Sequence, residues 1–306
     1  MNHHITIVCP GQGSQSVGML SSFDDDFVNS EYEKIKDLFD FDLIDIIQNN
    51  PNNLLNKSRY TQPAILFTSY LYWIKIKDLL PHQPNLLAGH SLGEFTALTI
   101  GGAFSLRDAL YIVYKRGAFM EAAKPSAMAA VLNLNLEDII TITNELNNTY
   151  PDEYIAPVNI NSPKQTVIGG TREIIDLAEN FFKEKGAKRY IKLDVSTASH
   201  CNIMKDAAQM LNDELNSISI NNTAIPILQN IDAKSYTEKS EILKNLTSQL
   251  IHPVQWVKTM KTISDKDGLV IECGPGKVLA GLGKANNCSV INISDDFKDK
   301  IKYIYG

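Results

Sequence analysis

The sequence has no long apolar run, little cysteine and no excess of positive charge, and each absence excludes a class of protein. No apolar stretch in its 306 residues approaches the roughly 18 to 20 residues that cross a bilayer. The four cysteines, Cys9, Cys201, Cys273 and Cys288, show no CxxC spacing, which argues against a disulfide framework or a zinc site. A net charge of −6 argues against nucleic acid as the main partner, because phosphate binding needs a basic face.

The N-terminal segment, Met1 to Val8, lacks the basic start and long apolar core of a secretion signal. Together with the scattered cysteines, this favours a reducing, cytoplasmic location. We expect no metal, no cofactor and no membrane partner, and we expect a monomer. The composition, 44% hydrophobic and 21% charged, is that of an ordinary globular protein. The length fits one large domain, alone or with an insert.

Short β-branched runs alternate with helical patterns over most of the chain. The runs predict strands over 5–9, 85–88, 225–228, 269–273 and 290–293, and the helical patterns cover 62–80, 94–99 and 107–121. Strands that alternate with helices indicate a mostly parallel sheet with helices on both faces.

The alternation changes between residues 127 and 194. There the patterns predict a strand (128–132), a helix (136–147), two strands (154–160 and 166–169), a helix (171–185) and a strand (189–193). That order, βαββαβ, is typical of a ferredoxin-like unit. The predicted domains are therefore a core of residues 1–126 and 195–306 and a small inserted subdomain of residues 127–194.

The segment Gly89-His90-Ser91-Leu92-Gly93 matches the G-x-S-x-G elbow, in which a serine lies on a sharp turn between a strand and a helix. An apolar strand precedes it and a helical pattern follows, which is the context that the elbow requires. The alternative is a serine that only caps the helix. If Ser91 is a nucleophile, the Leu92 N–H at the helix start can stabilise an oxyanion.

A nucleophilic serine needs a base, and His200 is the candidate. It follows Ser199 at the point where the chain leaves the insert, and an amphipathic helix comes after it. His90 adjoins Ser91, but on such a turn its side chain should point away from that of Ser91. A structural or surface histidine remains the alternative for His200. If it is the base, we expect the pH dependence of an ordinary imidazole.

Arg116 shares a helix face with Ala109, Ile112, Val113 and Met120. A guanidinium among apolar residues needs a partner, and its planar fork fits a carboxylate at two points. That carboxylate could belong to a ligand. The alternatives are a core salt bridge and a side chain that extends to water.

Several motifs, in order along the whole chain, resemble those of the malonyl-CoA–acyl carrier protein transacylase family. They are Pro10-Gly11-Gln12-Gly13-Ser14-Gln15, Gly89-His90-Ser91-Leu92-Gly93-Glu94, Lys115-Arg116-Gly117, Asn159-Ile160-Asn161-Ser162-Pro163, Ser199-His200, Pro253-Val254-Gln255-Trp256 and Gly274-Pro275-Gly276-Lys277. The resemblance implies an α/β fold: an α/β-hydrolase-like core with a mostly parallel sheet and an inserted ferredoxin-like subdomain. Cys9 stands where relatives often have an aromatic residue, and we interpret it as a small buried filler.

The resemblance also implies roles for single residues. Ser91 would be the acylated nucleophile and His200 its base, without a carboxylate as third member. The backbone carbonyl of Gln255 would orient His200. The N–H groups of Gln12 and Leu92 would form the oxyanion hole, and Arg116 would hold the free carboxylate of malonyl.

The expected activity is therefore that of an S-malonyltransferase, which moves malonyl from malonyl-CoA to acyl carrier protein, most simply for fatty acid synthesis. Two alternatives keep the same site: a free-standing acyltransferase of polyketide synthesis, and a hydrolase that strips acyl groups from carrier proteins. An inactive carrier-binding module is a third. The densest basic stretch, Lys183, Lys185, Lys188, Arg189 and Lys192, is a candidate docking surface for an acidic carrier.

Overall fold

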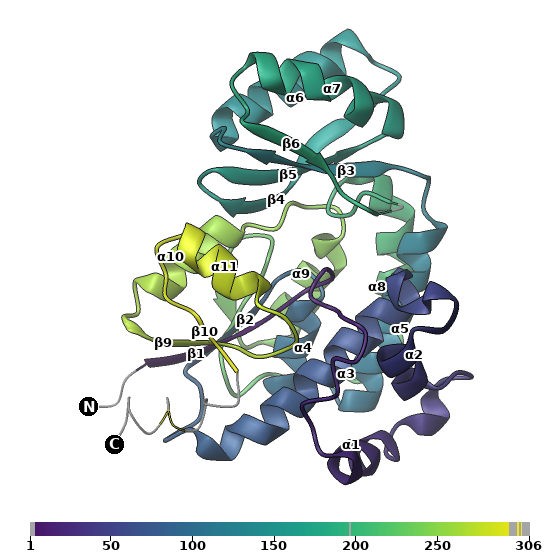
Figure 1. The fold of residues 1–306 in the computed structure, drawn as a ribbon, viewed down its shortest axis with the longest axis vertical. Coiled ribbons are helices and arrows are strands. Elements are labelled where there is room, and N and C mark those ends of the chain that lie inside the picture. Colours follow the sequence, from purple (N-terminus) through teal and green to yellow (C-terminus); the bar gives the residue numbers. More distant parts are fainter. Residues whose placement is uncertain (1–3, 196, 294–298, 300, 302–306) are drawn as a thin grey trace.

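The computed structural model describes residues 4–195, 197–293, 299 and 301. These residues form two units, each built around its own sheet (Figure 1). Within the described ranges, no helix is both long enough and apolar enough to cross a membrane.

The larger sheet has six strands in the order β10-β9-β1-β2-β7-β8. All its neighbouring strands are parallel except the last pair, β7 and β8. We call this sheet and its helices the six-stranded unit. The strands are β1 (His4–Cys9), β2 (Leu86–Gly89), β7 (Ile227–Leu228), β8 (Ser235–Tyr236), β9 (Gly268–Glu272) and β10 (Ile291–Asn292).

Helices cover both faces of this sheet because its strands are apolar on both sides (Figure 1). Ile5 and Ile7 of β1 join one hydrophobic cluster, and Val8 joins another. The first cluster includes residues of α1 (Asp25–Tyr32), α2 (Leu43–Asn49), α3 (Ser58–Ile76), α4 (Gly93–Ile100), α5 (Leu106–Ala122), α8 (Lys205–Ser217) and α9 (Lys239–Gln249). The second includes residues of α10 (Trp256–Ser264) and α11 (Val278–Ala285).

The smaller sheet is antiparallel, with the strand order β4-β5-β3-β6. Its elements are β3 (Ala127–Leu132), α6 (Leu136–Thr149), β4 (Ile155–Ser162), β5 (Gln165–Gly170), α7 (Arg172–Glu184) and β6 (Arg189–Lys192). We call residues 127–192 the four-stranded unit. Its chain order is the predicted βαββαβ, so the predicted fold class is confirmed. Both helices pack on one face of the sheet, where Ile139, Ile174 and Phe182 are buried.

The largest difference from the predicted elements is at α3. The helix begins at Ser58, four residues before the predicted start, and ends at Ile76, followed by a 3-10 turn over Lys77–Leu79. Pro63 therefore lies inside the helix, where its missing N–H leaves one backbone bond unmade. Further 3-10 turns cover Lys36–Leu38, Pro51–Asn56 and Asn202–Met204.

Candidate active site

Ser91 lies on the sharp turn that joins β2 to α4. β2 ends at Gly89, α4 begins at Gly93, and Ser91 has a φ of 52° in the left-handed region. Space behind the turn is tight: a Cβ on Gly93 would lie 2.0 Å from the carbonyl oxygen of Cys9. Glycine is therefore required there, and the loop after β1 lies directly against the turn. The predicted strand–turn–helix context of the elbow is confirmed.

His200 faces Ser91 across the turn. Its Nε2 lies 2.7 Å from Ser91 Oγ, and its side chain is buried. His200 also has a left-handed backbone, with a φ of 62°. Its Nδ1 lies 2.9 Å from the backbone carbonyl oxygen of Gln249. Because a carbonyl oxygen only accepts, Nδ1 carries the proton and Nε2 is free to accept the proton of Ser91.

The contact of Nδ1 corrects the expectation for Gln255. The carbonyl that orients His200 belongs to Gln249, the last residue of α9, whereas Gln255 stands at the start of α10. There the Gln255 carbonyl accepts from the Thr259 N–H at 3.0 Å, and the Gln255 N–H donates to the Asn230 carbonyl at 2.8 Å. Both backbone hydrogen-bonding groups of Gln255 are thus used where α10 begins.

Burial and, to a smaller extent, the positive charge of Arg116 lower the pKa of His200 to about 3. The hydrogen bond to the Gln249 carbonyl acts in the opposite direction. His200 is therefore neutral, and able to accept a proton, well below the pH range of an ordinary imidazole. This differs from the expectation of an ordinary histidine profile. The other nearby histidine, His90, points its Nε2 to Asn161 Oδ1 at 2.9 Å.

Arg116 is 1% exposed and reaches the site from α5. Nη1 donates to Gln62 Oε1 at 2.9 Å, and Nη2 donates to Gln249 Oε1 at 3.0 Å and to Ser91 Oγ at 3.2 Å. Among the described residues, Arg116 forms no ion pair, and its Nε has no hydrogen-bond partner. A buried cation held by neutral groups beside a serine is suited to receive an anionic ligand.

A buried carboxylate, Glu94, lies behind this group and was not assigned a role from the sequence. It accepts from the Asn230 N–H at 2.9 Å, from Gln249 Nε2 at 3.2 Å and from Gln229 Nε2 at 3.3 Å. Burial raises the pKa of Glu94 to about 7, while these donors and the charge of Arg116 oppose the rise. Gln249 thus connects Glu94, Arg116 and His200 through its side chain and its backbone.

Two N–H groups, of Gln12 and Leu92, come from the two loops that meet at Ser91. The loops touch, since a Cβ on Gly11 would lie 2.4 Å from the carbonyl oxygen of His90. Within the part of the chain that the structure describes, neither N–H donates a hydrogen bond to the protein. Both are therefore available to a ligand. Cys9, at the end of β1, is fully buried.

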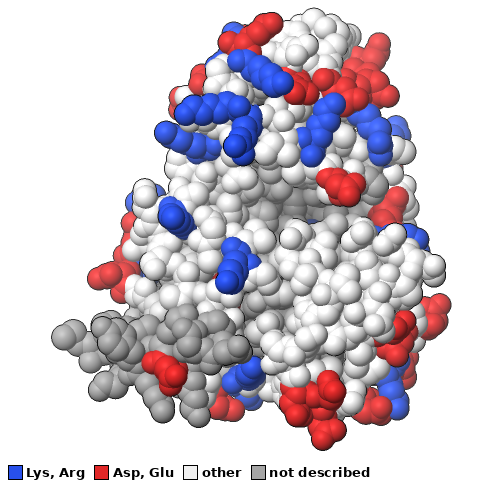
Figure 2. All heavy atoms as spheres, in the orientation of Figure 1, with Lys and Arg blue, Asp and Glu red and all other residues white. Residues whose placement is uncertain are grey.

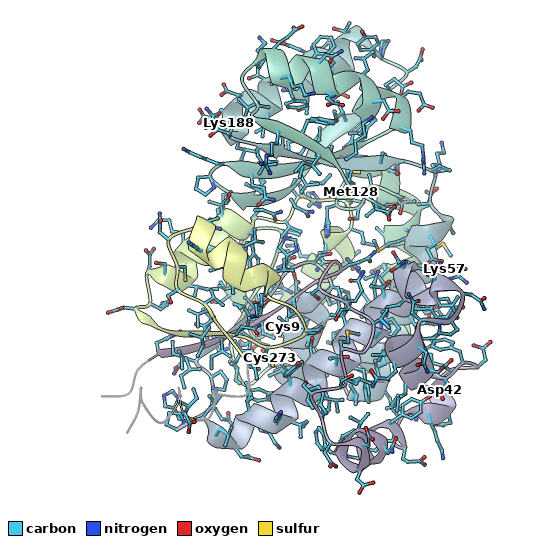
Figure 3. The ribbon with its side chains drawn as sticks, in the orientation of Figure 1. Cys9, Asp42, Lys57, Met128, Lys188 and Cys273 are labelled. Carbon is cyan, nitrogen blue, oxygen red and sulfur yellow. The ribbon has the colours of Figure 1, made fainter. Side chains whose placement is uncertain are left out.

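The basic stretch lies in the four-stranded unit, over the end of α7 and along β6, with Lys188 at its edge (Figure 3). Blue side chains gather on this part of the surface in Figure 2, above a hollow between the two units. Three of its five members already pair with acids: Lys183 with Glu179, Lys185 with Glu145 and Lys192 with Asp176. Lys188 and Arg189 form no ion pair with any described residue.

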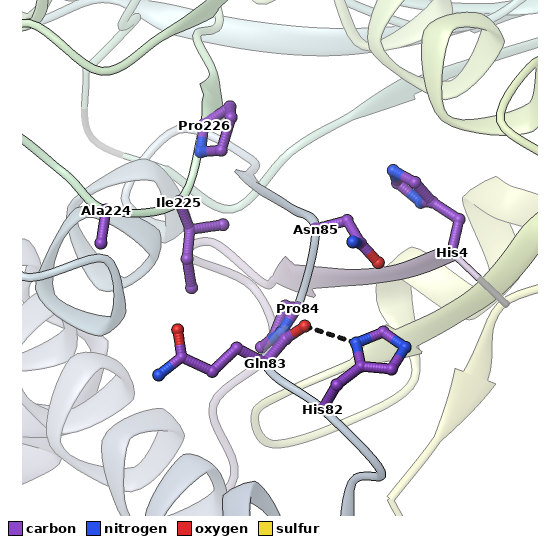
Figure 4. Close-up of a pocket in the computed structure, with 8 residues that line it drawn as sticks. All are labelled: His4, His82, Gln83, Pro84, Asn85, Ala224, Ile225 and Pro226. Carbon is purple, nitrogen blue, oxygen red and sulfur yellow. Dashed lines mark hydrogen bonds between the residues drawn. The ribbon is translucent and has the colours of Figure 1, made fainter. Parts of the chain in front are cut away.

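A cavity of about 560 Å³ lies elsewhere, at the amino ends of β1 and β2 (Figure 4). His4, His82, Asn85 and Pro226 are among its lining residues. Ligands of open parallel sheets bind at the carboxyl ends of the strands. Ser91 follows the carboxyl end of β2, whereas this cavity lies at the opposite ends of the strands. It is therefore not the candidate active site.

Comparison with known proteins assigns the chain to a family. The family model of the acyl transferase domain matches residues 6–289. The malonyl CoA-acyl carrier protein transacylase of Haemophilus influenzae is 39% identical over 298 residues, which cover 94% of this chain and 95% of the relative. The chain belongs to the malonyl-CoA–acyl carrier protein transacylase family of acyl transferases.

Solved structures agree with this assignment. The crystal structure of the malonyl-CoA:acyl carrier protein transacylase from Xanthomonas oryzae pv. oryzae superposes with a TM-score of 0.93 at 34% identity, and 99% of each chain is covered. A malonyl-transacylase in complex with the acyl-carrier protein of a type II PKS has a TM-score of 0.91 at 34% identity, covering 99% of this chain and 100% of that one.

Proposed function

We propose that this acyltransferase moves the malonyl group from malonyl-CoA to the pantetheine thiol of acyl carrier protein through an ester on Ser91. The observation that carries the proposal is the contact of Ser91 Oγ with both His200 Nε2 and Arg116 Nη2, at 2.7 and 3.2 Å. One partner accepts a proton, and the other is a buried cation within reach of a three-carbon acid. The malonyl CoA-acyl carrier protein transacylase of Haemophilus influenzae, which this chain matches over 95% of its length, supports malonyl-CoA and acyl carrier protein as the two substrates.

The first half-reaction loads Ser91. His200 Nε2 takes the hydroxyl proton as Oγ bonds to the thioester carbon. The N–H groups of Gln12 and Leu92 stabilise the oxyanion of the tetrahedral intermediate. The carbon–sulfur bond then breaks, and coenzyme A leaves with the proton from His200. The Gln249 carbonyl, 2.9 Å from Nδ1, would hold the tautomer and orientation of His200, which is the part that a carboxylate has in a triad.

The second half-reaction reverses these steps with a different thiol. His200 takes the proton of the pantetheine thiol, and the sulfur attacks the Ser91 ester. When the carbon–oxygen bond breaks, Ser91 Oγ regains the proton. The two thiols use one site in turn, which predicts ping-pong kinetics.

Arg116 would bind the free carboxylate of malonyl with its fork and position the thioester carbon over Ser91. This clamp favours a transferase over the hydrolase alternative, because a general hydrolase has no use for it. The complete set of Ser91, His200 and Arg116 at bonding distances speaks against an inactive carrier-binding module.

Mass spectrometry tests the proposal directly. After incubation with malonyl-CoA, we expect one malonyl adduct, which peptide mapping locates on Ser91, and no adduct on the Ser91→Ala variant. An adduct on another residue would overturn the mechanism. A wild-type protein that turns over malonyl-CoA without a stable adduct would point to the hydrolase.

The identity of the acceptor carrier protein is tested by measuring the rate of malonyl transfer from the loaded enzyme to carriers of each pathway. We propose the carrier of fatty acid synthesis as the preferred acceptor. Faster transfer to a polyketide carrier would reassign the pathway and leave the chemistry unchanged. The complex of a related transacylase with a type II PKS carrier makes this comparison necessary.

A further inference from the structure

Asn230 is a buried residue beside the candidate active site that the mechanism above does not use. It stands two residues after β7, the neighbour of β2 in the sheet, and is 2% exposed. Its position at the carboxyl ends of the strands brings its side chain to the turn that carries Ser91.

The carboxamide of Asn230 bonds both ends of that turn. Oδ1 accepts from the Ser91 N–H at 2.7 Å, and Nδ2 donates to the Gly89 carbonyl oxygen at 2.6 Å. The two backbone partners fix the orientation of the amide, because an N–H only donates and a carbonyl only accepts. Asn230 therefore closes a ring with the backbone of Gly89, His90 and Ser91.

This turn needs external support. A residue other than glycine in the left-handed region is strained and persists only where the surroundings hold it. Ser91 has a φ of 52°, and the short hydrogen bonds of Asn230 supply such a hold.

Asn230 is itself held on both sides. Its N–H donates to Glu94 Oε2 at 2.9 Å, and its carbonyl accepts from the Gln255 N–H at 2.8 Å. The buried Glu94 carboxylate and the start of α10 thus hold the backbone of Asn230 in place. Its side chain has little freedom to move.

We propose that Asn230 is a positioning residue for acyl transfer, which rests on the proposed role of Ser91 as the nucleophile. Its carboxamide sets the direction in which Ser91 Oγ points toward His200. It also engages the Ser91 N–H, so that the next N–H along the turn, that of Leu92, is the one left for the oxyanion. Within the described residues, Asn230 makes its hydrogen bonds to the backbone of Gly89, Ser91 and Gln255 and to Glu94, so it would act on Ser91 Oγ through the backbone.

The structure offers a matched control. In the four-stranded unit, Asn147 holds the backbone in the same way: its Oδ1 accepts from the Ile155 N–H at 3.0 Å, and its Nδ2 donates to the Ile155 carbonyl at 2.9 Å. Asn147→Ala therefore removes the same two kinds of hydrogen bond far along the chain from Ser91. The control shows what the loss of two side chain–backbone hydrogen bonds does in general, apart from the loss of the two that hold the turn at Ser91.

The test measures the rate of Ser91 malonylation in a single turnover, at a series of malonyl-CoA concentrations. We expect Asn230→Ala to lower the maximal rate by about 10- to 100-fold, because a small misplacement of a nucleophile has effects of this size. The half-saturating concentration and the preference for malonyl over acetyl should stay within about threefold of wild type, since Arg116 is untouched. Asn147→Ala should load at the wild-type rate.

Asn230→Asp gives a second readout that a general loss of stability would not produce. An ionised carboxylate keeps the acceptor for the Ser91 N–H but repels the Gly89 carbonyl, whereas a protonated carboxyl can donate to it. Of the titratable groups nearby, Glu94 has a pKa within this range, at about 7, whereas the pKa is about 3 for His200 and about 10 for Arg116. Wild type is therefore measured at each pH. The deficit of Asn230→Asp relative to wild type should shrink as the pH falls from 8 to 5.5.

The outcomes are separable. Equal loading by Asn230→Ala and Asn147→Ala would overturn the proposal. If Asn230→Ala does not fold, Asn230→Asp decides alone, and a deficit that is the same at every pH would overturn it. The proposed function fails in a different way: wild type then shows no adduct on Ser91, whatever the variants do.

Discussion

The interiors of the two units differ in polarity. The four-stranded unit is filled with apolar side chains such as Ile139, Ile168, Ile174 and Phe182. The six-stranded unit buries, at the carboxyl ends of its strands, a connected set of polar groups: Gln62, Glu94, Arg116, His200, Gln229, Asn230, Asn245 and Gln249. Burying polar groups is unfavourable unless each finds partners. The apolar interior serves stability alone, whereas the polar interior contains the residues that the proposed reaction uses.

Removing the proposed base, His200, should have the largest effect within the polar set. Among the described residues, His200 is the only group that contacts Ser91 Oγ as a proton acceptor. We therefore expect His200→Ala to lower malonyl loading by about 10² or more. Circular dichroism on the same sample checks the fold. Near-normal loading would show that the polar interior does not supply the base.

The pH profile of loading sharpens this prediction. The folded pKa of His200 is about 3, below the ordinary value of about 6.5, so the base stays deprotonated as the pH falls through the usual histidine range. We expect kcat/KM of wild type to show no histidine-type loss between pH 8 and 5. In Arg116→Ala one cause of the lowered pKa of His200 is gone. Any loss of kcat/KM at low pH should therefore begin at a higher pH than in wild type.

Arg116→Ala should have the next largest effect, and it should depend on the acyl group. Loss of a charged two-point contact corresponds to about 2 to 4 kcal/mol, or roughly 30- to 1000-fold in kcat/KM for malonyl transfer. Acetyl-CoA has no carboxylate, so its transfer should be kept or increased. Arg116→Lys should restore malonyl transfer only in part, since a point charge cannot supply the fork.

Both substrates are to be assayed on folded protein. Equal losses for malonyl and acetyl would make Arg116 a structural residue of the polar interior.

Charge reversal on the four-stranded unit should have a smaller effect and should spare the chemistry. Lys188→Glu with Arg189→Glu should raise the KM for carrier protein several-fold at low salt, while loading from malonyl-CoA is unchanged. The matched control is Lys183→Glu with Lys192→Glu, since both lysines already pair with acids of their own unit. An unchanged KM for the carrier at low salt would remove this surface from consideration.

A cavity in the apolar interior should have the smallest effect on transfer. Phe182 is fully buried in the four-stranded unit, and Phe182→Ala should lower the free energy of unfolding by about 3 to 5 kcal/mol. Below the unfolding transition, kcat for malonyl loading should stay close to wild type. A loss of kcat in protein shown to be folded would mean that this interior also serves the reaction.

The sequence predicted those parts of the site that depend on local pattern. The elbow around Ser91, the apolar face that buries Arg116 and the position of His200 after the insert are each visible within a few residues. Gln255 was assigned from the resemblance of the segment that contains it, but the folded chain brings the carbonyl of Gln249, on the other side of the turn, to the imidazole. Glu94 and Asn230 lie in separate segments that the sheet order brings together, so no local pattern links them. The one available signal was the Gln229-Asn230 pair directly after a buried strand, where parallel sheets place their ligands.

The bridge between the two units has a mechanical consequence. Val254 donates to the Val158 carbonyl of β4 and accepts from the Ile160 N–H, both at 2.9 Å, so the chain just beyond α9 is stitched to the edge of the smaller sheet. Gln249, which aims His200, lies five residues before Val254 along that chain. A displacement of the four-stranded unit that widened the hollow would therefore pull on residues 249–254. It would shift the Gln249 carbonyl that accepts from His200.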